Sequence, residues 1–519
     1  MQGKKHYTEK LFTSFQLSDR VPEDNFYRRL KAQLDIDFLR EETKIYYGTE
    51  GNSSIDPIVF FKLILVGYFE NLNSDRKIIN HASLRLDILY FIGYDIDEEL
   101  PWHSTLSRTR GLYGEDVFRK LFKTVLSLCA KKGMVAGKRQ AIDSAFIKAN
   151  ASLDSVAEKE VIADGEEFLN ELESNDENKV KASKKAEVEY HHSWKEKTYR
   201  DQPGKGRVDK EVDEFGNTIR PRYLSNHTHY STTDRDARIS VKPGKPRQFN
   251  YSAQTSVDTQ SHVITNIMAD FSDKKDSSSL PQVIKQTKEN LEANGLLLEE
   301  VLADAGYSSG SALANLKANN ITGYIPNFGL YKPERTGFIK NKELNQYECQ
   351  RGNKAIIIYK GERKRRDGNE NVYRSSEKVC GTCPFREECC GKNTKFKKIT
   401  ETVDKHLYDE MHERLKSQHA KRMKIQRSST VEPVLGTLIN FTGMRRIWTR
   451  GIDNANKFVL GAAIAYNLKK WLNWQEINKK STRNKPAKVE NPVKSAISAC
   501  EDLIKPFQAT KYFQPIFLN

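Results

Sequence analysis

The sequence has no run of about 18 apolar residues, the length that a helix needs to cross a membrane. Its longest apolar stretch, residues 58–69, is shorter and contains Lys62. No apolar segment follows the charged start MQGKKHYTEK, so we expect no secretory signal. A G-x-x-x-x-G-K-[ST] loop is also missing, which argues against ATP as a ligand. These absences favour a cytosolic protein without a membrane span.

Cysteine is scarce, with 7 in 519 residues. Cys129 and Cys500 stand alone, and each is most simply a small buried apolar side chain. The other five fall between residues 349 and 390, where a cytosolic chain is not expected to form disulfides.

The spacing Cys380-x2-Cys383-x5-Cys389, with Cys349 upstream, offers four thiolates to a tetrahedral Zn²⁺, and Cys390 could replace Cys389. No second C-x2-C completes the usual pattern, so reduced cysteines in a loop remain the alternative to a structural zinc site. A redox role is not indicated, because no thioredoxin-like βαβ pattern surrounds the C-x-x-C.

What the sequence has in excess is positive charge. Lys and Arg number 85 against 69 Asp and Glu, a formal net charge of +16. Such a charge attracts polyanions, either nucleic acid or an anionic membrane surface. The length predicts two to four domains.

Residues 1–135 have the pattern of several short helices. Asp56 is a candidate N-cap with Pro57 at the first helical position, and Ser74 or Asp75 can cap the next helix. We expect residues 103–105 to cap a third. Helices with exposed basic residues suit a DNA-binding domain, and a bundle that packs on the next domain is the alternative. The basic residues are Arg76, Lys77, Arg108, Arg110 and Arg119.

Residues 136–328 predict the first part of an α/β core. The expected order is a strand (138–150), a hairpin turning near residue 260, a helix (277–295), a strand that ends at Asp304, a helix (309–320) and a strand (321–328). The charged stretch 155–200 predicts a solvated helical insertion, and 201–248 a loop.

Three further segments complete the expected organisation. Residues 329–420 form an inserted subdomain with the cysteines, and 421–475 return to the core as helices. Residues 476–519 are a basic linker and an aromatic tail.

Three acids in different contexts suit a site for divalent metal: Asp143 in a strand, Asp304 at a strand end, and Glu432 where a loop runs into a helix rich in arginine. Mg²⁺ prefers oxygen ligands. Two such ions about 3.5–4 Å apart clamp the attacking and leaving oxygens of a phosphodiester. Surface or capping roles are the alternative, and other acids compete: Asp234, Asp236, Asp258, Asp270 and Asp276. For Asp258 we favour a turn or strand-end role.

Basic residues surround the third acid. Those between residues 421 and 457 are placed to hold DNA phosphates. Trp448 can stack on an unpaired base or pack in the core. The DNA-binding candidates are Arg427, Arg445, Arg446, Trp448, Arg450 and Lys457.

Taken in order, several motifs resemble bacterial insertion-sequence DDE transposases, in particular the eleven-eighty-two type within the insertion-sequence-four-like group. They are DPIVFFKLILVGYFENLNSDRKI, HSTLSRTR, AIDSAFIKANAS, TTDRDARISVKPGKPRQFNYSAQTSVD, ADAGYSS, CGTCPFREEC, RSSTVEPVLGTLINFTGMRR and TRGIDNANKFVLGAAIAYNLKK. The match spans nearly the whole chain.

The resemblance implies a ribonuclease-H-like core, a mixed sheet flanked by helices, with Asp143, Asp304 and Glu432 holding two Mg²⁺ or Mn²⁺ ions. One departure concerns the related Tyr-x2-Arg-x3-Glu-x6-Lys signature, whose Tyr, Arg and Lys positions are here Ile425, Ser428 and Ile439. Arg427 is one residue out of register, so Arg445 and Arg446 become candidates for phosphate contact.

The implied function is a bacterial, nucleoid-associated DNA transposase. It would bind terminal inverted repeats as a homodimer in a synaptic complex and cleave and transfer DNA strands to a target. One alternative is a catalytically inactive, repurposed DNA-binding relative, and another is a ribonuclease-H-like nuclease without end specificity.

Overall fold

The computed structural model describes residues 14–159 apart from 49 and 51–53, together with 189–190, 226, 229–240, 247–327, 331, 333–365 and 368–483, and a few positions before residue 14. Contacts divide the chain into residues 1–469 and 470–519. Of the second unit, the structure describes only the end of one helix.

The described elements up to residue 131 are all helical. They are α1 (Leu17–Arg20), α2 (Phe26–Gln33), α3 (Phe38–Thr43), η1 (Lys44–Tyr46), α4 (Pro57–Phe69), α5 (Asp75–Ser83), α6 (Leu86–Ile92), α7 (His103–Leu112) and α8 (Glu115–Lys131). Helix α4 is apolar on nearly all sides and almost entirely buried, as a central helix must be. The predicted cap at its start is confirmed, because Asp56 accepts from the backbone N–H of Ile58 at 2.7 Å.

Two details of the other caps differ from expectation. Ser74 occupies the N-cap of α5 but makes no side-chain hydrogen bond there. Helix α7 already begins at His103, with Trp102 at the N-cap, so the prediction that residues 103–105 cap it is wrong.

The central feature is a mixed sheet of six strands: β1 (Arg139–Lys148), β5 (Arg238–Ser240), β6 (Gln248–Asp258), β7 (Ile264–Phe271), β8 (Glu300–Leu302) and β9 (Thr322–Tyr324). Strand β1 lies in the middle, antiparallel to β6 and parallel to β8. Beyond them, β7 pairs antiparallel with β6, and β9 pairs parallel with β8. The predicted hairpin of β6 and β7 and the predicted strand at 138–150 are confirmed.

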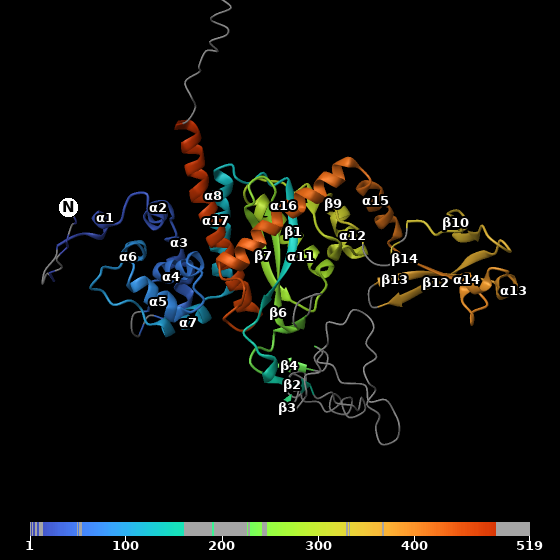
Figure 1. Cartoon of the computed structure of the whole chain (residues 1–519), viewed down its shortest axis with the longest axis horizontal. Coiled ribbons are helices and arrows are strands. Elements are labelled where there is room, and N and C mark those ends of the chain that lie inside the picture. The colour runs from blue at the N-terminus through green and yellow to red at the C-terminus, as the bar shows by residue number, and fades with distance from the viewer. Residues whose placement is uncertain are drawn as a thin grey trace, which may run out of the picture. The chain divides into compact units, whose positions relative to one another are not determined.

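Helices flank this sheet, and Figure 1 shows the labelled elements. Helix α11 (Asp276–Glu292) packs on β6 and β7, while α16 (Gln418–Phe441) packs on β1 and β6. An apolar core joins α11, α12 (Gly310–Ala318) and α15 (Lys405–Leu415) to the sheet and includes Ile142 of β1. Successive strand residues point to opposite faces, so Asp143, next to Ile142, faces away from this core.

A second sheet lies within the predicted insertion. Its five strands form an antiparallel meander: β10 (Phe338–Asn341), β11 (Gln346–Cys349), β12 (Ile356–Arg365), β13 (Gly368–Ser375) and β14 (Lys398–Thr402). Two one-turn helices, α13 (Glu377–Gly381) and α14 (Arg386–Cys390), connect β13 to β14. The sheet's own core has four buried side chains, Tyr347, Ile357, Tyr373 and Ile399.

The stretch 155–248 differs from expectation where the structure describes it. Short strands β2 (Val156–Lys159), β3 (Glu189–Tyr190) and β4 (His229–Ser231) pair in a small sheet. Strand β5 also falls in the stretch predicted to be a loop. The predicted helical insertion otherwise lies outside the described residues.

The position of Glu432 is a further correction. Residues 427–432 are not a loop but part of the continuous helix α16, and Pro433 also lies inside it. Proline there removes one backbone donor, but the carbonyl that loses its partner belongs to the exposed residue Ser429 and can bind water. The apolar face of α16, including Val431, Val434 and Leu438, is buried and holds the helix together.

The last helix, α17 (Ile452–Arg483), continues past residue 475, so the predicted linker begins in helical structure. The rest of the predicted linker and tail, from residue 484, lies outside the described residues.

Candidate active site and nucleic-acid surface

Two of the three predicted acids lie close enough for the charge of Asp304 to act on Asp143. In the parallel pair of β1 and β8, Ala141 is opposite Leu302, and each acid follows two residues further along the chain. Asp304 follows the end of β8 and caps η3 (Ala305–Tyr307), accepting from the Gly306 backbone N–H at 2.9 Å. The strand pairing thus brings Asp304, just beyond the end of β8, toward Asp143 within β1.

Arg427 connects the third acid to this pair. Its Nη1 lies 2.7 Å from Oδ2 of Asp143, and its Nη2 lies 3.2 Å from Oε1 of Glu432. The side chains of Asp143 and Arg427 are each 17% exposed, whereas Glu432 is 59% exposed. One guanidinium therefore stands between two of the predicted metal ligands.

The environment shifts the ionisation of Asp143. Burial raises the pKa of its carboxyl above the usual value, and the charge of Asp304 acts in the same direction. The backbone N–H of Ser144 and the cation of Arg427 oppose this rise in pKa. A nearby positive charge thus favours the deprotonated form of Asp143.

A buried tyrosine, Tyr307, is affected by the charges of the same acids. Burial raises the pKa of Tyr307 well above its usual value, and the carboxylates of Asp276, Asp143 and Asp304 add to the rise. Tyr307 donates to Oε1 of Gln254 at 2.5 Å, and Nε2 of Gln254 donates to Asp276 at 2.8 Å.

Asp276, at the start of α11, therefore belongs to the surroundings of the acids. The sequence indicated it only as one of several possible neighbours. Both Asp276 and Asp304 have a carboxylate oxygen facing Gly306. Only the fold, which brings α11 up to η3, identifies Asp276 among the competing acids.

The other competing acids have structural partners. Asp258 is fully buried and accepts from the backbone N–H groups of Gly137 and Gln260, which confirms its predicted strand-end role. Asp234 and Asp236 accept from backbone N–H groups at the start of α17. Asp270 accepts from Lys274 and Ser279.

The donor chemistry of Asp143, Asp304 and Glu432 fits a hard divalent ion. Across the described residues, however, no three His, Cys, Asp or Glu side chains already stand in a geometry that would hold a metal ion. In this structure, the positive charge between Asp143 and Glu432 is the guanidinium of Arg427. The exposed side chain of Glu432 is able to rotate if Arg427 leaves.

The DNA-binding candidates divide into two groups. Arg445, Trp448 and Arg450 are exposed in the segment between α16 and α17. Arg427, by contrast, pairs with the acids. Lys457 is 6% exposed and donates to the carbonyl of Arg110 at 3.1 Å, an interior position rather than the exposed one that a DNA contact requires.

The half-buried Arg446 and the exposed Trp448 contact each other. The guanidinium of Arg446 lies 4.7 Å from the ring centroid of Trp448, and its Nη2 donates to Asn150 at 3.1 Å. Asn150 in turn donates to the carbonyl of Trp448 at 2.8 Å. Trp448 is 42% exposed, so its core-packing alternative does not describe this structure.

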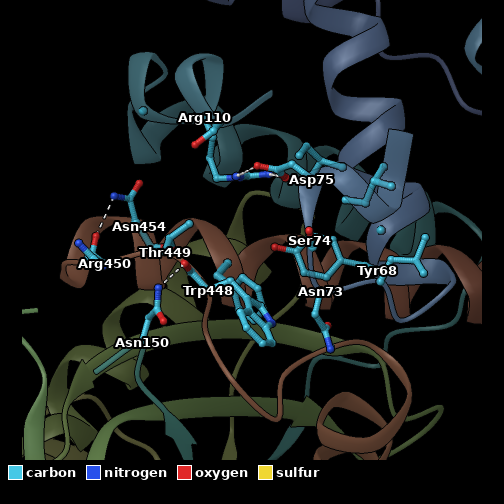
Figure 2. Close-up of a pocket in the computed structure, with 18 residues that line it drawn as sticks. Tyr68, Asn73, Ser74, Asp75, Arg110, Asn150, Trp448, Thr449, Arg450 and Asn454 are labelled. Carbon is cyan, nitrogen blue, oxygen red and sulfur yellow. Dashed lines mark hydrogen bonds and ion pairs between the residues drawn. The ribbon is translucent and has the colours of Figure 1, made fainter. Parts of the chain in front are cut away.

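Trp448 and Asn150 belong to one wall of a cavity of about 410 Å³. Figure 2 shows Trp448, Thr449 and Arg450 on one side, and Tyr68, Asn73, Ser74, Asp75 and Arg110 on the other. At its far end Arg110 pairs with Asp75 at 2.5 Å, so Arg110 is not the free surface cation expected from its sequence context. Asn150 is seven residues beyond Asp143 along the chain, which places the cavity on the order of 20 Å from the acids.

The five clustered cysteines line a separate cavity of about 160 Å³. Burial and the neighbouring thiols of Cys389 and Cys380 raise the pKa of Cys390 to about 11. Cys129 is buried in α8, as expected. Cys500 lies outside the described residues.

Comparison with known families agrees with these features. Residues 15–112 match the family model of a Transposase domain (DUF772), and residues 348–472 match that of a Transposase DDE domain. Together they support an insertion-sequence DDE transposase, and the second match suggests a polynucleotidyl transferase or nuclease. Glu432 lies inside the second match, whereas Asp143 and Asp304 lie outside both. No curated protein was found to match the chain.

The described helices also bear on membrane association. None of them is both long enough and apolar enough to cross a membrane.

Proposed function

We propose that the chain is the DNA transposase of an insertion sequence, with a ribonuclease-H-like core whose acids are Asp143, Asp304 and Glu432. The observation that supports the proposal is that one guanidinium, that of Arg427, contacts both Asp143 and Glu432, while the charge of Asp304 acts on Asp143. The sheet supports the same core, because β5, β7 and β1 pair antiparallel with β6, whereas β1, β8 and β9 pair parallel.

The chemistry that Mg²⁺ or Mn²⁺ supplies at such a site is a lowered pKa for a water or 3′-hydroxyl and stabilisation of the leaving oxygen. Asp143 would contribute its carboxylate from β1 and Asp304 from just beyond β8, the strand that pairs parallel with β1. Glu432 completes the donor set from α16. Cleavage and strand transfer are both displacements at phosphorus, so one site serves both.

In this proposal Arg427 also contacts DNA. Once a metal ion takes the space between Asp143 and Glu432, the guanidinium of Arg427 is free to contact the scissile phosphate. It can form paired hydrogen bonds with that phosphate. Arg445, Arg446 and Arg450 hold the flanking DNA backbone, and Trp448 stacks on an unpaired base. Binding of two element ends calls for a homodimer in the synaptic complex.

The test is strand transfer by the full chain. The inverted repeats that flank the gene supply the end sequence, which is prepared with a free 3′-hydroxyl and incubated with target DNA and Mg²⁺. We expect joined products with the unaltered chain and none with Glu432→Gln, whereas the matched control Glu413→Gln, an exposed glutamate on α15, retains them.

Two results would replace the proposal. End-specific binding without any cleavage or joining identifies a repurposed DNA-binding protein. The altered Tyr/Arg/Lys signature is the observation that favours this alternative. Cleavage of unrelated duplex as fast as of the repeats identifies a nuclease without end specificity.

A further inference from the structure

The connection between β13 and β14 is held by very few apolar contacts. Of the residues from 376 to 397, all of them described, Cys380 alone is buried. None of them belongs to the four-residue core of the insertion's sheet. A unit with so little buried apolar surface usually needs a disulfide or a metal to keep its structure.

Five cysteines meet at this connection. Cys349 ends strand β11, Cys380 lies in α13, Cys383 follows in the next turn, and Cys389 and Cys390 end α14. All five line the cavity of about 160 Å³. Its volume exceeds the roughly 30 Å³ that one water occupies, so there is room for an ion among the sulfurs.

The backbone already brings the two sides of the cavity together. Cys349 Sγ lies 3.2 Å from the carbonyl of Arg351, and the sulfur of Cys383 packs against the next residue, Gly352. Gly352 has φ of +53° and leaves no room for a Cβ beside that sulfur. The turn of the β11–β12 hairpin therefore approaches the C-x-x-C turn as closely as a backbone can.

The charges around the cavity suit thiolates. Arg351, Arg386 and Lys397 line it, against the single acid Glu388. Four thiolates around Zn²⁺ carry a net charge of −2, which cationic neighbours stabilise. Lys397 donates to the carbonyl of Cys389 at 2.5 Å, so one of these cations is held beside the cysteines.

We propose that this cavity is a structural Zn²⁺ site in which Cys349, Cys380, Cys383 and one of the adjacent pair Cys389 and Cys390 are the ligands. Zn²⁺ takes four sulfur ligands at about 2.3 Å in tetrahedral sites. Each thiol releases its proton to solvent on binding, and no oxidation occurs. The ion ties the β11–β12 hairpin to α13 and α14, and this role is independent of the proposed transposase activity.

The sulfurs do not yet surround one point, because among the described residues no three metal-ligating side chains stand in coordinating geometry. Closing them on an ion needs rotation about the Cα–Cβ bonds, since the backbones already face the same cavity. The site is thus open in this structure.

The experiment measures zinc in the full chain, purified with a non-thiol reductant, by mass spectrometry of the elements. We expect about one zinc per chain, and Co²⁺ exchanged into the site should give the intense absorption of a tetrahedral thiolate complex. Cys380→Ser should lose the zinc. The control Cys129→Ser, at a fully buried position in α8, should keep it.

A conservative variant covers the case in which Cys380→Ser does not fold. Cys383→His supplies a nitrogen ligand in place of sulfur and should retain zinc, with the Co²⁺ absorption reduced as one thiolate is lost. Absence of zinc from the unaltered chain overturns the proposal. So does zinc that persists in Cys380→Ser, or a mass showing disulfides between these cysteines in protein alkylated without reduction.

Discussion

Arg427 makes its closest charged contact with Asp143, at 2.7 Å between Nη1 and Oδ2, although the two residues are 284 positions apart in the chain. The same guanidinium reaches Glu432. A cation and a divalent metal ion cannot both occupy the space between these two carboxylates. The arrangement therefore makes Arg427 a competitor for the metal that the proposed reaction needs.

Replacing Arg427 with glutamine should tighten divalent metal binding. Removal of the competing charge is expected to lower the dissociation constant for Mn²⁺ about tenfold, which corresponds to about 1.4 kcal/mol. Mn²⁺ titration followed by electron paramagnetic resonance measures this without any DNA. Arg422→Gln, at an exposed position on the same helix, should leave the affinity unchanged, and equal effects of both variants would mean that Arg427 does not compete.

The contacts of Glu401 allow a prediction of how the stability of the inserted sheet depends on pH. Its carboxylate, 4% exposed, pairs with Lys340 and accepts from Tyr347 at 2.6 Å and Tyr373 at 2.7 Å. Burial alone would raise the pKa of Glu401, but these partners outweigh it and hold the pKa below its usual value. Its contribution to stability is therefore present above the unfolded pKa, about 4.3, and is lost as pH falls through the lower folded pKa.

Glu401→Gln should accordingly destabilise the insertion by about 2 kcal/mol at pH 7, since it leaves Lys340 without its partner. Urea denaturation at pH 7 and at successively lower pH measures the difference in the free energy of unfolding. We expect the difference to shrink below pH of about 4. A difference that stays constant with pH would exclude the ionised carboxylate as its source.

The sequence predicts strands at Asp143 and before Asp304, and both strands are found there for a physical reason. The role of the two acids as a metal-binding pair stays a prediction. Each lies in or directly after a short apolar strand, and the ends of adjacent parallel strands meet at one edge of a sheet. Strand patterns are local, so β1, the β6–β7 hairpin, α12 and β9 were all predicted close to where they lie.

Features that depend on tertiary packing were not predictable in this way. The sequence places Glu432 where a loop runs into a helix, yet burial of one face makes α16 a continuous helix through Glu432 and Pro433. Lys457 looked like a surface cation because its neighbours along the chain are basic, but α17 turns it toward the interior. Arg427, one residue out of register with the related signature, still reaches both acids because its side chain is long.

Trp448 should matter only for DNA with an unpaired base. Stacking of a base on an aromatic ring contributes about 1–3 kcal/mol, so Trp448→Ala should weaken binding to end DNA with an unpaired overhang by about fivefold or more. Fluorescence anisotropy compares this DNA with a blunt duplex, whose affinity should change little. Trp102→Ala, at another exposed tryptophan, is the control, and an equal loss on both DNAs would argue against stacking.

Salt dependence separates the exposed arginines from Lys457. Each phosphate contact on duplex DNA adds about 0.9 to the slope of log affinity against log salt. Arg450→Gln, which removes an exposed charge, should reduce that slope by about one contact. Lys457→Met should leave it unchanged, because this ammonium is bound to the carbonyl of Arg110 in the interior and its pKa is lowered chiefly by burial. Anisotropy titrations over a range of salt concentrations give both slopes. A reduced slope for Lys457→Met would mean that α17 exposes this residue to DNA, as its basic sequence context first suggested.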